Sequence, residues 1–193
     1  PIFVDAPLGS KVTDVYRRYP QYYNDEAKRH LERDPDLFSF KGLSVIDTAH
    51  DSQNIEETKN PKIIIAGAGM SHGGRIRNHE KRYIEDANAT ILFSGYQAAG
   101  SLGRRLQDGA KKVLIDDEWH TVRAHMATLT GYSAHKGRDE LVSFVEDSAD
   151  TLEKVLVCLG EPRTSLFLTQ RLREFLGVDA VAPSEGESFT FAM

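Results

Sequence analysis

The sequence has 193 residues, of which 40% are hydrophobic and 27% charged, so it is long enough for one large domain or two small ones. A net charge of −5 argues against a protein that coats nucleic acid non-specifically, although it leaves room for a local basic groove. A single cysteine excludes an internal disulfide framework, and no apolar run approaches the roughly 18 residues of a membrane span. Since no charged-then-apolar signal peptide is present either, the prediction is a cytoplasmic protein without membrane contact.

The first half of the chain alternates short apolar runs with helical patterns. Strands are predicted at 2–5, 43–47, 62–66 and 89–96, and helices at 11–23, 25–33, 52–59, 75–85 and 102–106. Asp25 is expected to cap the second of these helices, and Gly100 with Ser101 opens the last. The first strand begins without an initiator methionine, which suits a piece cut from a longer protein.

The pattern changes after residue 110. Residues 111–130 alternate as strands around an Asp-Asp turn, and 154–159 is typical of a buried strand. Helices are predicted at 139–145 and 164–176, followed by extended segments at 178–192. Strands separated by helices predict an α/β protein with a largely parallel sheet.

Residues 63–75, IIIAGAGMSHGGR, run from a β-branched strand straight into a glycine-rich turn. Its glycines are Gly67, Gly69, Gly73 and Gly74. They permit close backbone approach, and the helix opened by Arg75 offers free N–H groups to an anion. A dinucleotide site requires G-x-G-x-x-G and a later carboxylate, whereas here the third glycine comes one place late and the next strand has no acidic residue. The segment favours an anion site for a ligand other than NAD, and the alternative is a glycine turn that only packs helix on strand.

Two further turns follow strands in the same way. Residues 94–105, SGYQAAGSLGRR, bring Gln97, Ser101, Arg104 and Arg105 to a helix start, and residues 131–137, GYSAHKG, place His135 at a turn tip. Because ligands bind at the carboxyl ends of parallel strands, the three turns are predicted to line one cleft. A histidine there suits general acid chemistry near neutral pH, and the alternative is an ordinary surface histidine.

Four segments, in this order, resemble one family closely: PIFVDAPLGSKV, AGAGMSHGGRIRNH, ILFSGYQAAGSLGRRLQDGAKKV and VRAHMATLTGYSAHKGRDEL. The family is the β-CASP metallo-β-lactamases, which include bacterial RNA-processing nucleases and the endonuclease of eukaryotic mRNA 3′-end cleavage. The resemblance implies an α/β fold, with a Rossmann-like β-CASP domain and its parallel sheet, followed by C-terminal strands and helices of a metallo-β-lactamase fold. Residues 1–112 are then the later part of the β-CASP domain, and residues 113–193 are the C-terminal part of the metallo-β-lactamase domain.

The resemblance also implies site residues, because RNA threads the cleft between the two domains of the family beside two zinc ions. His135, in Ser133-Ala134-His135, matches the family's second conserved motif, whose histidine contacts the scissile phosphate and assists protonation of the leaving group. The residues expected to bind RNA phosphates are Gly67, Gly69, Met70, Ser71, Gly73, Gly74, Arg75, Gln97, Gly100, Ser101, Arg104, Arg105 and Ser133. Arg77, Lys81 and Arg82 are further candidates, with a solvated helix face as their alternative role.

Two features depart from the family. Its upstream zinc-binding cluster H-x-H-x-D-H is missing, since no two of the seven histidines are separated by a single residue. Zinc is therefore expected in the complete protein and not in this chain alone. Where the family has Val-His-Gly-Glu, this chain has Val157-Cys158-Leu159-Gly160-Glu161, so leucine stands at the histidine position.

Two single residues carry expectations of their own. Cys158 is expected to be a small buried residue; a thiolate ligand is the alternative, but the shift by one residue points it to the opposite face of a strand. Asp5 is expected to cap or orient the first turn, because the family's acidic first motif lies upstream.

The predicted function is the RNA-binding and catalytic-cleft portion of a zinc-dependent ribonuclease, a hydrolase that is inactive as this chain alone. One alternative, favoured by Leu159, is a β-CASP pseudo-nuclease that binds RNA or partners without cutting. A second alternative is an enzyme that binds a mononucleotide. The expected partners are RNA, the missing N-terminal metallo-β-lactamase part of the same protein and a second copy in a homodimer.

Overall fold

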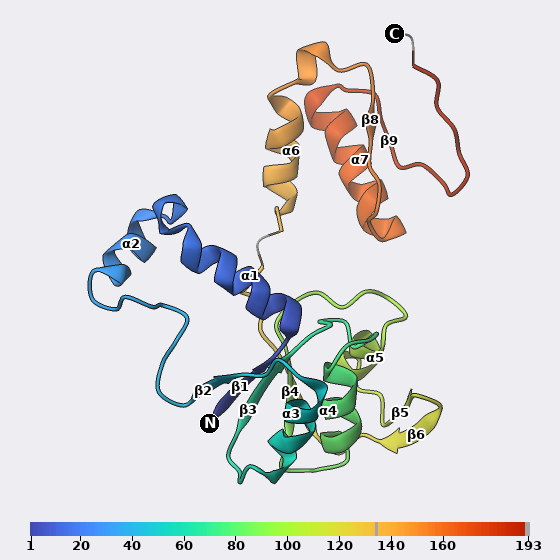
Figure 1. The fold of residues 1–193 in the computed structure, drawn as a ribbon. Coiled ribbons are helices and arrows are strands. Elements are labelled where there is room, and N and C mark those ends of the chain that lie inside the picture. Colours follow the sequence, from blue (N-terminus) through green and yellow to red (C-terminus); the bar gives the residue numbers. More distant parts are fainter. Residues whose placement is uncertain (134, 192–193) are drawn as a thin grey trace. The chain divides into compact units, whose positions relative to one another are not determined.

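A computed structural model describes residues 1–133 and 135–191 and shows two compact units, residues 1–132 and 133–193 (Figure 1). The strands of the first unit are β1 (Ile2–Asp5), β2 (Leu43–Val45), β3 (Ile63–Ala66), β4 (Thr90–Phe93), β5 (Lys112–Ile115), β6 (Glu118–Thr121) and β7 (His125–Thr128). Its helices are α1 (Pro7–Arg18), α2 (Asp25–Leu31), α3 (Ala49–Asn54), α4 (Ile76–Tyr83) and α5 (Leu102–Gln107), with the short 3-10 turns η1 (Pro20–Tyr22) and η2 (Ile55–Glu57). None of the described helices has the length and apolar content needed to cross a membrane.

The strands of the first unit are mostly parallel. β1 lies between β2 and β3 in a three-stranded parallel sheet, and β4 pairs in parallel with β7. β5 and β6 form an antiparallel hairpin around Asp116 and Asp117, which both take left-handed φ values of 48° and 64°. The α/β prediction with parallel strands is confirmed, but the strands form several short sheets and not a single one.

The core of the first unit lies under β4 and β5. Its buried side chains are Ile84, Phe93, Leu102, Leu106, Val113 and Ile115. They come from two strands, the end of α4 and one face of α5, whose buried positions recur at the spacing of a helix. Burial of each large apolar side chain stabilises the fold by about 1.5–3 kcal/mol, so this cluster anchors the turns that enter α4 and α5.

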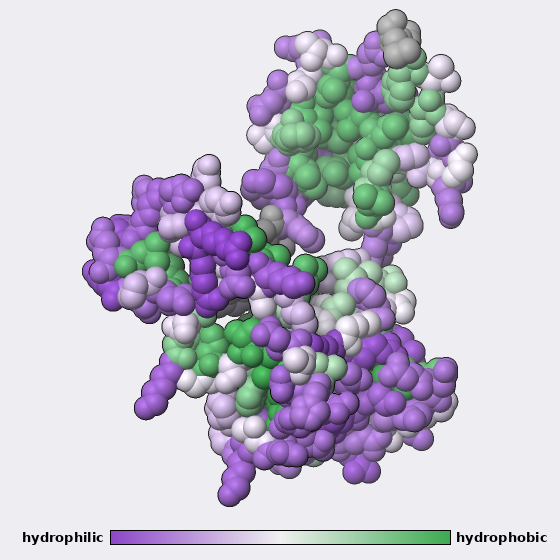
Figure 2. Space-filling model, viewed as in Figure 1, coloured by the Kyte–Doolittle hydropathy of each residue, from purple (hydrophilic) through white to green (hydrophobic). Residues whose placement is uncertain are grey.

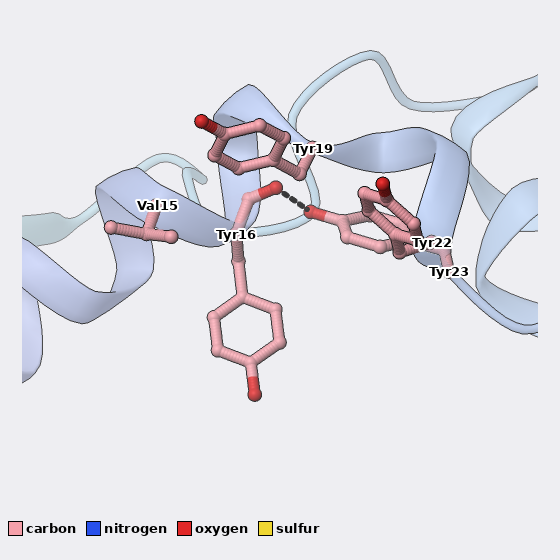
Figure 3. A pocket seen from close by; sticks show the side chains of 5 residues that line it. All are labelled: Val15, Tyr16, Tyr19, Tyr22 and Tyr23. Atoms are coloured by element: carbon pink, nitrogen blue, oxygen red, sulfur yellow. Dashed lines mark hydrogen bonds between the residues drawn. The ribbon is translucent and has the colours of Figure 1, made fainter.

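Helix α1 is different, because none of its residues is buried. It begins four residues before the predicted start, with Pro7 in its first turn, and it ends at Arg18 ahead of Pro20, since a residue before proline disfavours helical geometry. Side chains of α1 and η1, together with Tyr19 and Tyr23, surround an open hollow (Figure 3). The next helix, α2, is capped by Asn24, whose Oδ1 accepts from the amide of Ala27 at 2.8 Å, and not by Asp25.

The second unit consists of α6 (Arg138–Glu146), η3 (Ala149–Thr151), β8 (Val155–Leu156), α7 (Pro162–Leu176) and β9 (Ala180–Val181). The parallel pair β8–β9 packs with α7 around the buried Leu172, Val178 and Ala180. Apolar surface gathers on this unit (Figure 2), where Phe144, Leu166 and Phe175 are more than half exposed. The division after Tyr132 separates compact units, so the family domain boundary after residue 112 stays a prediction.

The prediction of a buried strand at 154–159 is confirmed only in part, since a strand forms within this range but it is short and not buried. Only Val155 and Leu156 form β8, and Leu159 is fully exposed. Among the described strands β8 pairs with β9 alone, over two residues. In such a short two-stranded ladder one face of an apolar run packs on the helices, and the other face is exposed.

Candidate functional site

The glycine-rich turn joins β3 to α4 and closes on itself. The amide of Ala68 donates to the carbonyl oxygen of Gly73 at 3.1 Å, and the amide of Ile76 donates to that of Gly67 at 3.0 Å. Gly74 has a φ of +74°, and a Cβ at this position would lie 2.4 Å from the carbonyl oxygen of Gly67. A side chain would force the two ends of the turn apart, so the closed shape requires a glycine here.

The closed turn leaves several amides available at the start of α4. Within the described residues, the N–H groups of Gly73, Gly74 and Arg75 donate to no backbone or side-chain acceptor. They precede an eight-residue helix, whose N-terminal end carries a partial positive charge. Free amides at a helix N-terminus form an arrangement that binds phosphate or carboxylate groups.

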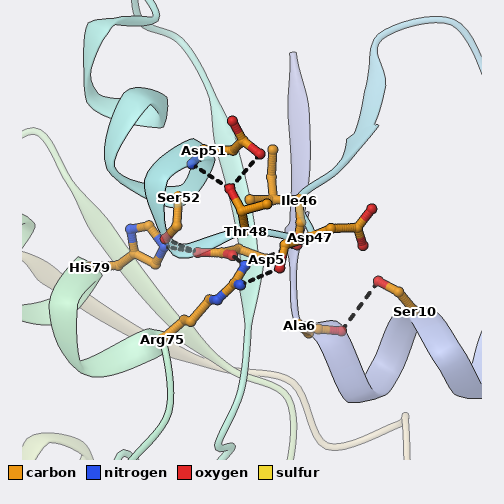
Figure 4. Close-up of polar contacts among 10 residues, drawn as sticks. All are labelled: Asp5, Ala6, Ser10, Ile46, Asp47, Thr48, Asp51, Ser52, Arg75 and His79. Carbon is orange, nitrogen blue, oxygen red and sulfur yellow. Dashed lines mark hydrogen bonds and ion pairs between the residues drawn. The ribbon is translucent and has the colours of Figure 1, made fainter.

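Asp5, the last residue of β1, is completely buried behind this turn (Figure 4). Its carboxylate accepts from Ser52 Oγ at 2.5 Å, from His79 Nε2 at 2.7 Å and from Nη1 of Arg75. Burial by itself raises the pKa of Asp5, but hydrogen bonds from Ser52, Arg75 and His79 outweigh it and hold the pKa below its ordinary value. An ionised Asp5 therefore ties β1, α3 and the start of α4 together.

The Arg75 side chain is turned inward and is extensively bonded. Besides Asp5, its guanidinium donates to the carbonyl oxygens of Ile46 at 2.9 Å and of Asp47 at 2.6 Å. A contact from this side chain to an RNA phosphate stays a prediction, since its described role is to hold the turn. Of the two expected roles of Asp5, the cap of the first turn is wrong, because Ala6 is the N-cap of α1 and no side chain bonds there. A role in orienting that turn stays a prediction.

A second buried pair supports the inner side of the turn. Ser71 takes a left-handed φ of 57°, and its hydroxyl donates to Oε1 of Glu80. Both residues are buried, and Oε2 of Glu80 has no partner among the described residues. Burial raises the pKa of Glu80 and outweighs the opposite effects of the Ser71 hydrogen bond and the Arg77 charge. The hydroxyl of Ser71 thus faces Glu80, and its expected phosphate contact stays a prediction.

The second glycine turn, between β4 and α5, is braced against the first. Nε2 of the buried Gln97 donates to the carbonyl oxygen of Gly69 at 2.8 Å, and the amide of Gly103 donates to that of Met70 at 3.3 Å. A Cβ at Gly103 would lie 1.8 Å from Oε1 of Gln97. Gly103 was not among the predicted site residues. The signal that could have found it is a glycine inside a helix, which costs helix stability and needs a packing reason.

Ser101 opens α5 as predicted, since its Oγ accepts from the amide of Arg104 at 3.1 Å, and Gly100 precedes it with a φ of +85°. The Arg104 side chain lies 3.0 Å from the carboxylate of Asp108. Arg105 is exposed and forms no ion pair with any described residue, so its guanidinium is available to a phosphate. The other candidate cations are paired: Arg77 with Asp116, Lys81 with Glu118 and Arg82 with Glu56.

Ser133 and His135 belong to the second compact unit. Both are exposed, and the amide of His135 donates to Ser133 Oγ at 3.2 Å. Residue 134 lies outside the described residues. The first two glycine turns are therefore brought together by direct hydrogen bonds, whereas a cleft shared with His135 stays a prediction.

Among the described residues, no group of three His, Cys, Asp or Glu side chains lies close enough to hold a metal ion. Cys158 is exposed, so the expectation of a buried residue is wrong. Cys158 lies after the end of the short strand β8, and not in the middle of a long strand. Leu159 takes a left-handed φ of 64° and is fully exposed, and an aliphatic side chain cannot bind a metal.

The chain matches two family models and several curated proteins. Residues 1–106 match the model of the Beta-Casp domain, and residues 119–183 match that of the Zn-dependent metallo-hydrolase RNA specificity domain. Among curated relatives, Ribonuclease TTHA0252 of Thermus thermophilus is 32% identical over 86% of this chain and 36% of its own length. Transcription termination factor FttA of Pyrococcus horikoshii is 27% identical over 95% of this chain and 29% of its own length. The FttA of Cenarchaeum symbiosum is 30% identical over 97% of this chain and 30% of its own length. The chain thus spans about a third of the length of these relatives.

Proposed function

Because the chain belongs to the β-CASP family, we propose that it supplies the RNA-binding portion of the catalytic cleft of a zinc-dependent ribonuclease that hydrolyses RNA phosphodiester bonds. The observation that carries this proposal is the closed glycine turn, whose amides at Gly73, Gly74 and Arg75 point to no internal acceptor. The match to an RNA specificity domain and the name of a ribonuclease relative support the choice of RNA phosphate as the anion.

In this proposal each part of the chain has a separate task. The amides of the glycine turn bind a backbone phosphate, and Arg105 contributes a positive charge from the neighbouring turn. In hydrolysis the oxygen of a water molecule bonds to phosphorus and releases a proton to solvent, while the bond between phosphorus and the leaving oxygen breaks. His135 donates a proton to that leaving oxygen. In this proposal the ligands of the family's zinc ions lie mostly upstream of this chain.

Exposed apolar side chains of the second unit suggest the first of the proposed protein partners. The exposed Phe144, Leu166 and Phe175 suit coverage by the N-terminal metallo-β-lactamase part of the same protein, because apolar patches of this kind mark interfaces. The domain boundary after residue 112, a homodimer and a cytoplasmic location are further parts of the proposal.

One observation favours a second function, that of a pseudo-nuclease that binds RNA without cutting it. Leu159 stands where the family has a histidine, and its side chain is fully exposed. Zinc content and cleavage by the longer protein distinguish the two functions. A metal-bound, active parent that loses cleavage with His135→Ala supports the nuclease. A metal-free or inactive parent that still binds RNA supports the pseudo-nuclease.

The RNA part of the proposal is tested with fluorescein-labelled single-stranded RNA and this chain. We expect weak binding that falls as salt rises, and we expect Arg104→Ala with Arg105→Ala to reduce the slope of log K against log salt by about 0.7 per lost phosphate contact. Arg29→Ala with Arg33→Ala on and beside α2 is the matched control. Equal effects of the two pairs would contradict the proposed surface.

The chain alone is expected to leave RNA intact with or without added zinc, because the ligand cluster of the family is absent. The measurement is a gel of end-labelled RNA alongside elemental analysis of zinc per chain. Metal-dependent cleavage that His135→Ala abolishes would show that the active site is complete within these residues.

A further inference from the structure

Helix α1 carries an apolar seam that no described residue covers. Leu8, Val12, Val15 and Tyr19 follow one another at steps of four, three and four residues, and they are 76%, 46%, 52% and 50% exposed. Steps of three and four place these side chains in one narrow line along the helix, which is the pattern of a helix that packs lengthwise against a second helix.

The composition of α1 shows that it depends on such packing. It has 12 residues, and Gly9 and three β-branched residues (Val12, Thr13 and Val15) lower its helix propensity. Helices shorter than about 12–15 residues are marginal in water, and in proteins most of their stability comes from burial of an apolar face. Since α1 buries no residue, the contacts that it makes within the described residues leave its apolar face largely exposed.

One flank of α1 is already occupied by the chain itself. Arg17 donates to Oδ1 of Asp36 at 3.1 Å and to the carbonyl oxygen of Phe38 at 3.0 Å. The rings of Tyr16 and Phe38 lie 6.3 Å apart in a tilted arrangement. The loop that follows α2 therefore covers the side of Tyr16 and Arg17, and the seam stays open beside it.

The seam ends in a hollow of about 360 Å³. Its lining residues are Val15, Tyr16, Tyr19, Tyr22 and Tyr23 (Figure 3). Tyr23 Oη donates to the carbonyl oxygen of Tyr16 at 2.9 Å, which holds Tyr23, the residue after η1, against the end of α1. A hollow lined by tyrosines has the size and chemistry to take one large apolar side chain, as the central anchor of an interface does.

Two positive charges beside the seam favour a partner with negative charges. Lys11 and Arg18 flank it on the same side, both are exposed, and neither forms an ion pair within the described part of the chain. Side chains in these flanking positions set partner choice and orientation in helix pairs. Two cations on one flank repel a second copy of the same flank and attract carboxylates.

From the seam, the hollow and these two cations we propose that α1 is a docking site for an amphipathic helix from outside this sequence, with an apolar face and an acidic flank. This inference goes beyond the proposed function and uses none of its residues. The partner helix lies along Leu8, Val12 and Val15, places one large apolar side chain in the tyrosine hollow and pairs its carboxylates with Lys11 and Arg18.

The experiment uses two stapled helical peptides of about 21 residues with leucine along one seam, one with glutamate at the flanking positions and one with lysine. Fluorescence anisotropy with the whole chain should show at least about ten-fold tighter binding of the glutamate peptide. Val15→Asp should weaken that binding by a similar factor, and Lys11→Glu with Arg18→Glu should reverse the preference. Lys28→Glu with Arg29→Glu on α2 is the matched control and should leave the preference unchanged.

Amide hydrogen exchange gives a second readout that does not depend on these variants. Exchange of the α1 amides should slow in the presence of the glutamate peptide, and that of the α7 amides should stay the same. Failure of both peptides to bind, or a preference that survives charge reversal, would overturn the proposal. So would sedimentation that shows a dimer dissociated by Val15→Asp, which assigns the seam to a second copy, or RNA binding lost with Tyr19→Ala and Tyr22→Ala.

Discussion

Two segments leave the carboxyl ends of neighbouring parallel strands, and they are held in opposite ways. The turn after β3 is supported from within, by the buried carboxylates of Asp5 and Glu80. Helix α1, which follows β1, has no buried residue and exposes its apolar seam. The glycine turn is therefore held in its conformation by internal contacts without a ligand, whereas α1 exposes an apolar face of the kind that a binding partner covers.

The largest expected effect separates two Asp–Arg pairs. Asp5→Ala leaves Arg75 and His79 without their buried partner, and it should lower the free energy of unfolding by about 3–5 kcal/mol. Asp14→Ala removes the exposed pair with Arg17 on α1 and should cost less than about 1 kcal/mol. Urea unfolding followed by circular dichroism measures both. Equal losses would mean that the Asp5 network does not support the turn.

Two glycines give the next largest contrast. Gly74→Ala should destabilise the chain by about 1–3 kcal/mol, because its left-handed backbone and the contact with Gly67 exclude a side chain. Gly9→Ala on α1 should instead stabilise it by about 0.5–1 kcal/mol, since the added Cβ makes only an ordinary contact at 3.4 Å with that of Ala6.

Gly73→Ala is the control for the turn, because its Cβ would meet nothing within 4 Å. Thermal unfolding and RNA anisotropy should both distinguish Gly74→Ala from this neighbour. If the two variants behave alike, the closed shape of the turn is not what limits either stability or binding.

The smallest expected effect concerns pH. Burial raises the pKa of Glu80, so its protonated form stabilises the fold fully below its ordinary pKa, and this contribution is lost as pH rises through the raised value. Glu80→Gln keeps an acceptor for Ser71 without a charge. The melting temperature of the variant relative to wild type should therefore rise between pH 4 and pH 8 by a few degrees.

Thr13→Val on α1 is the comparison for this pH series. The change removes a hydroxyl that donates to the carbonyl oxygen of Gly9 and involves no titratable group, so the difference in melting temperature from wild type should stay nearly constant over the same range. A flat curve for Glu80→Gln as well would show that Glu80 titrates in the fold as it does in the unfolded chain.

Local chemistry explains which parts of the fold were predictable. The turn between β3 and α4, the cap by Ser101 and the hairpin around Asp116 and Asp117 each depend on a few consecutive residues. Glycine, serine and aspartate act there through the backbone next to them, which a sequence pattern records. The length and burial predicted for the strand at 154–159 were wrong, because burial depends on what covers each face of a strand, and no local pattern records that.

The sequence by itself determined an α/β chain with parallel strands, its glycine turns, and a resemblance that the family models confirm. Only the tertiary structure decided that Asp5 meets His79, 74 residues away, and that Gln97 and Gly103 join the two turns. It also decided that α1 keeps its seam uncovered. The physical reason is that turns and caps are made by neighbours in the chain, whereas buried polar partners and open apolar faces depend on which distant segments meet.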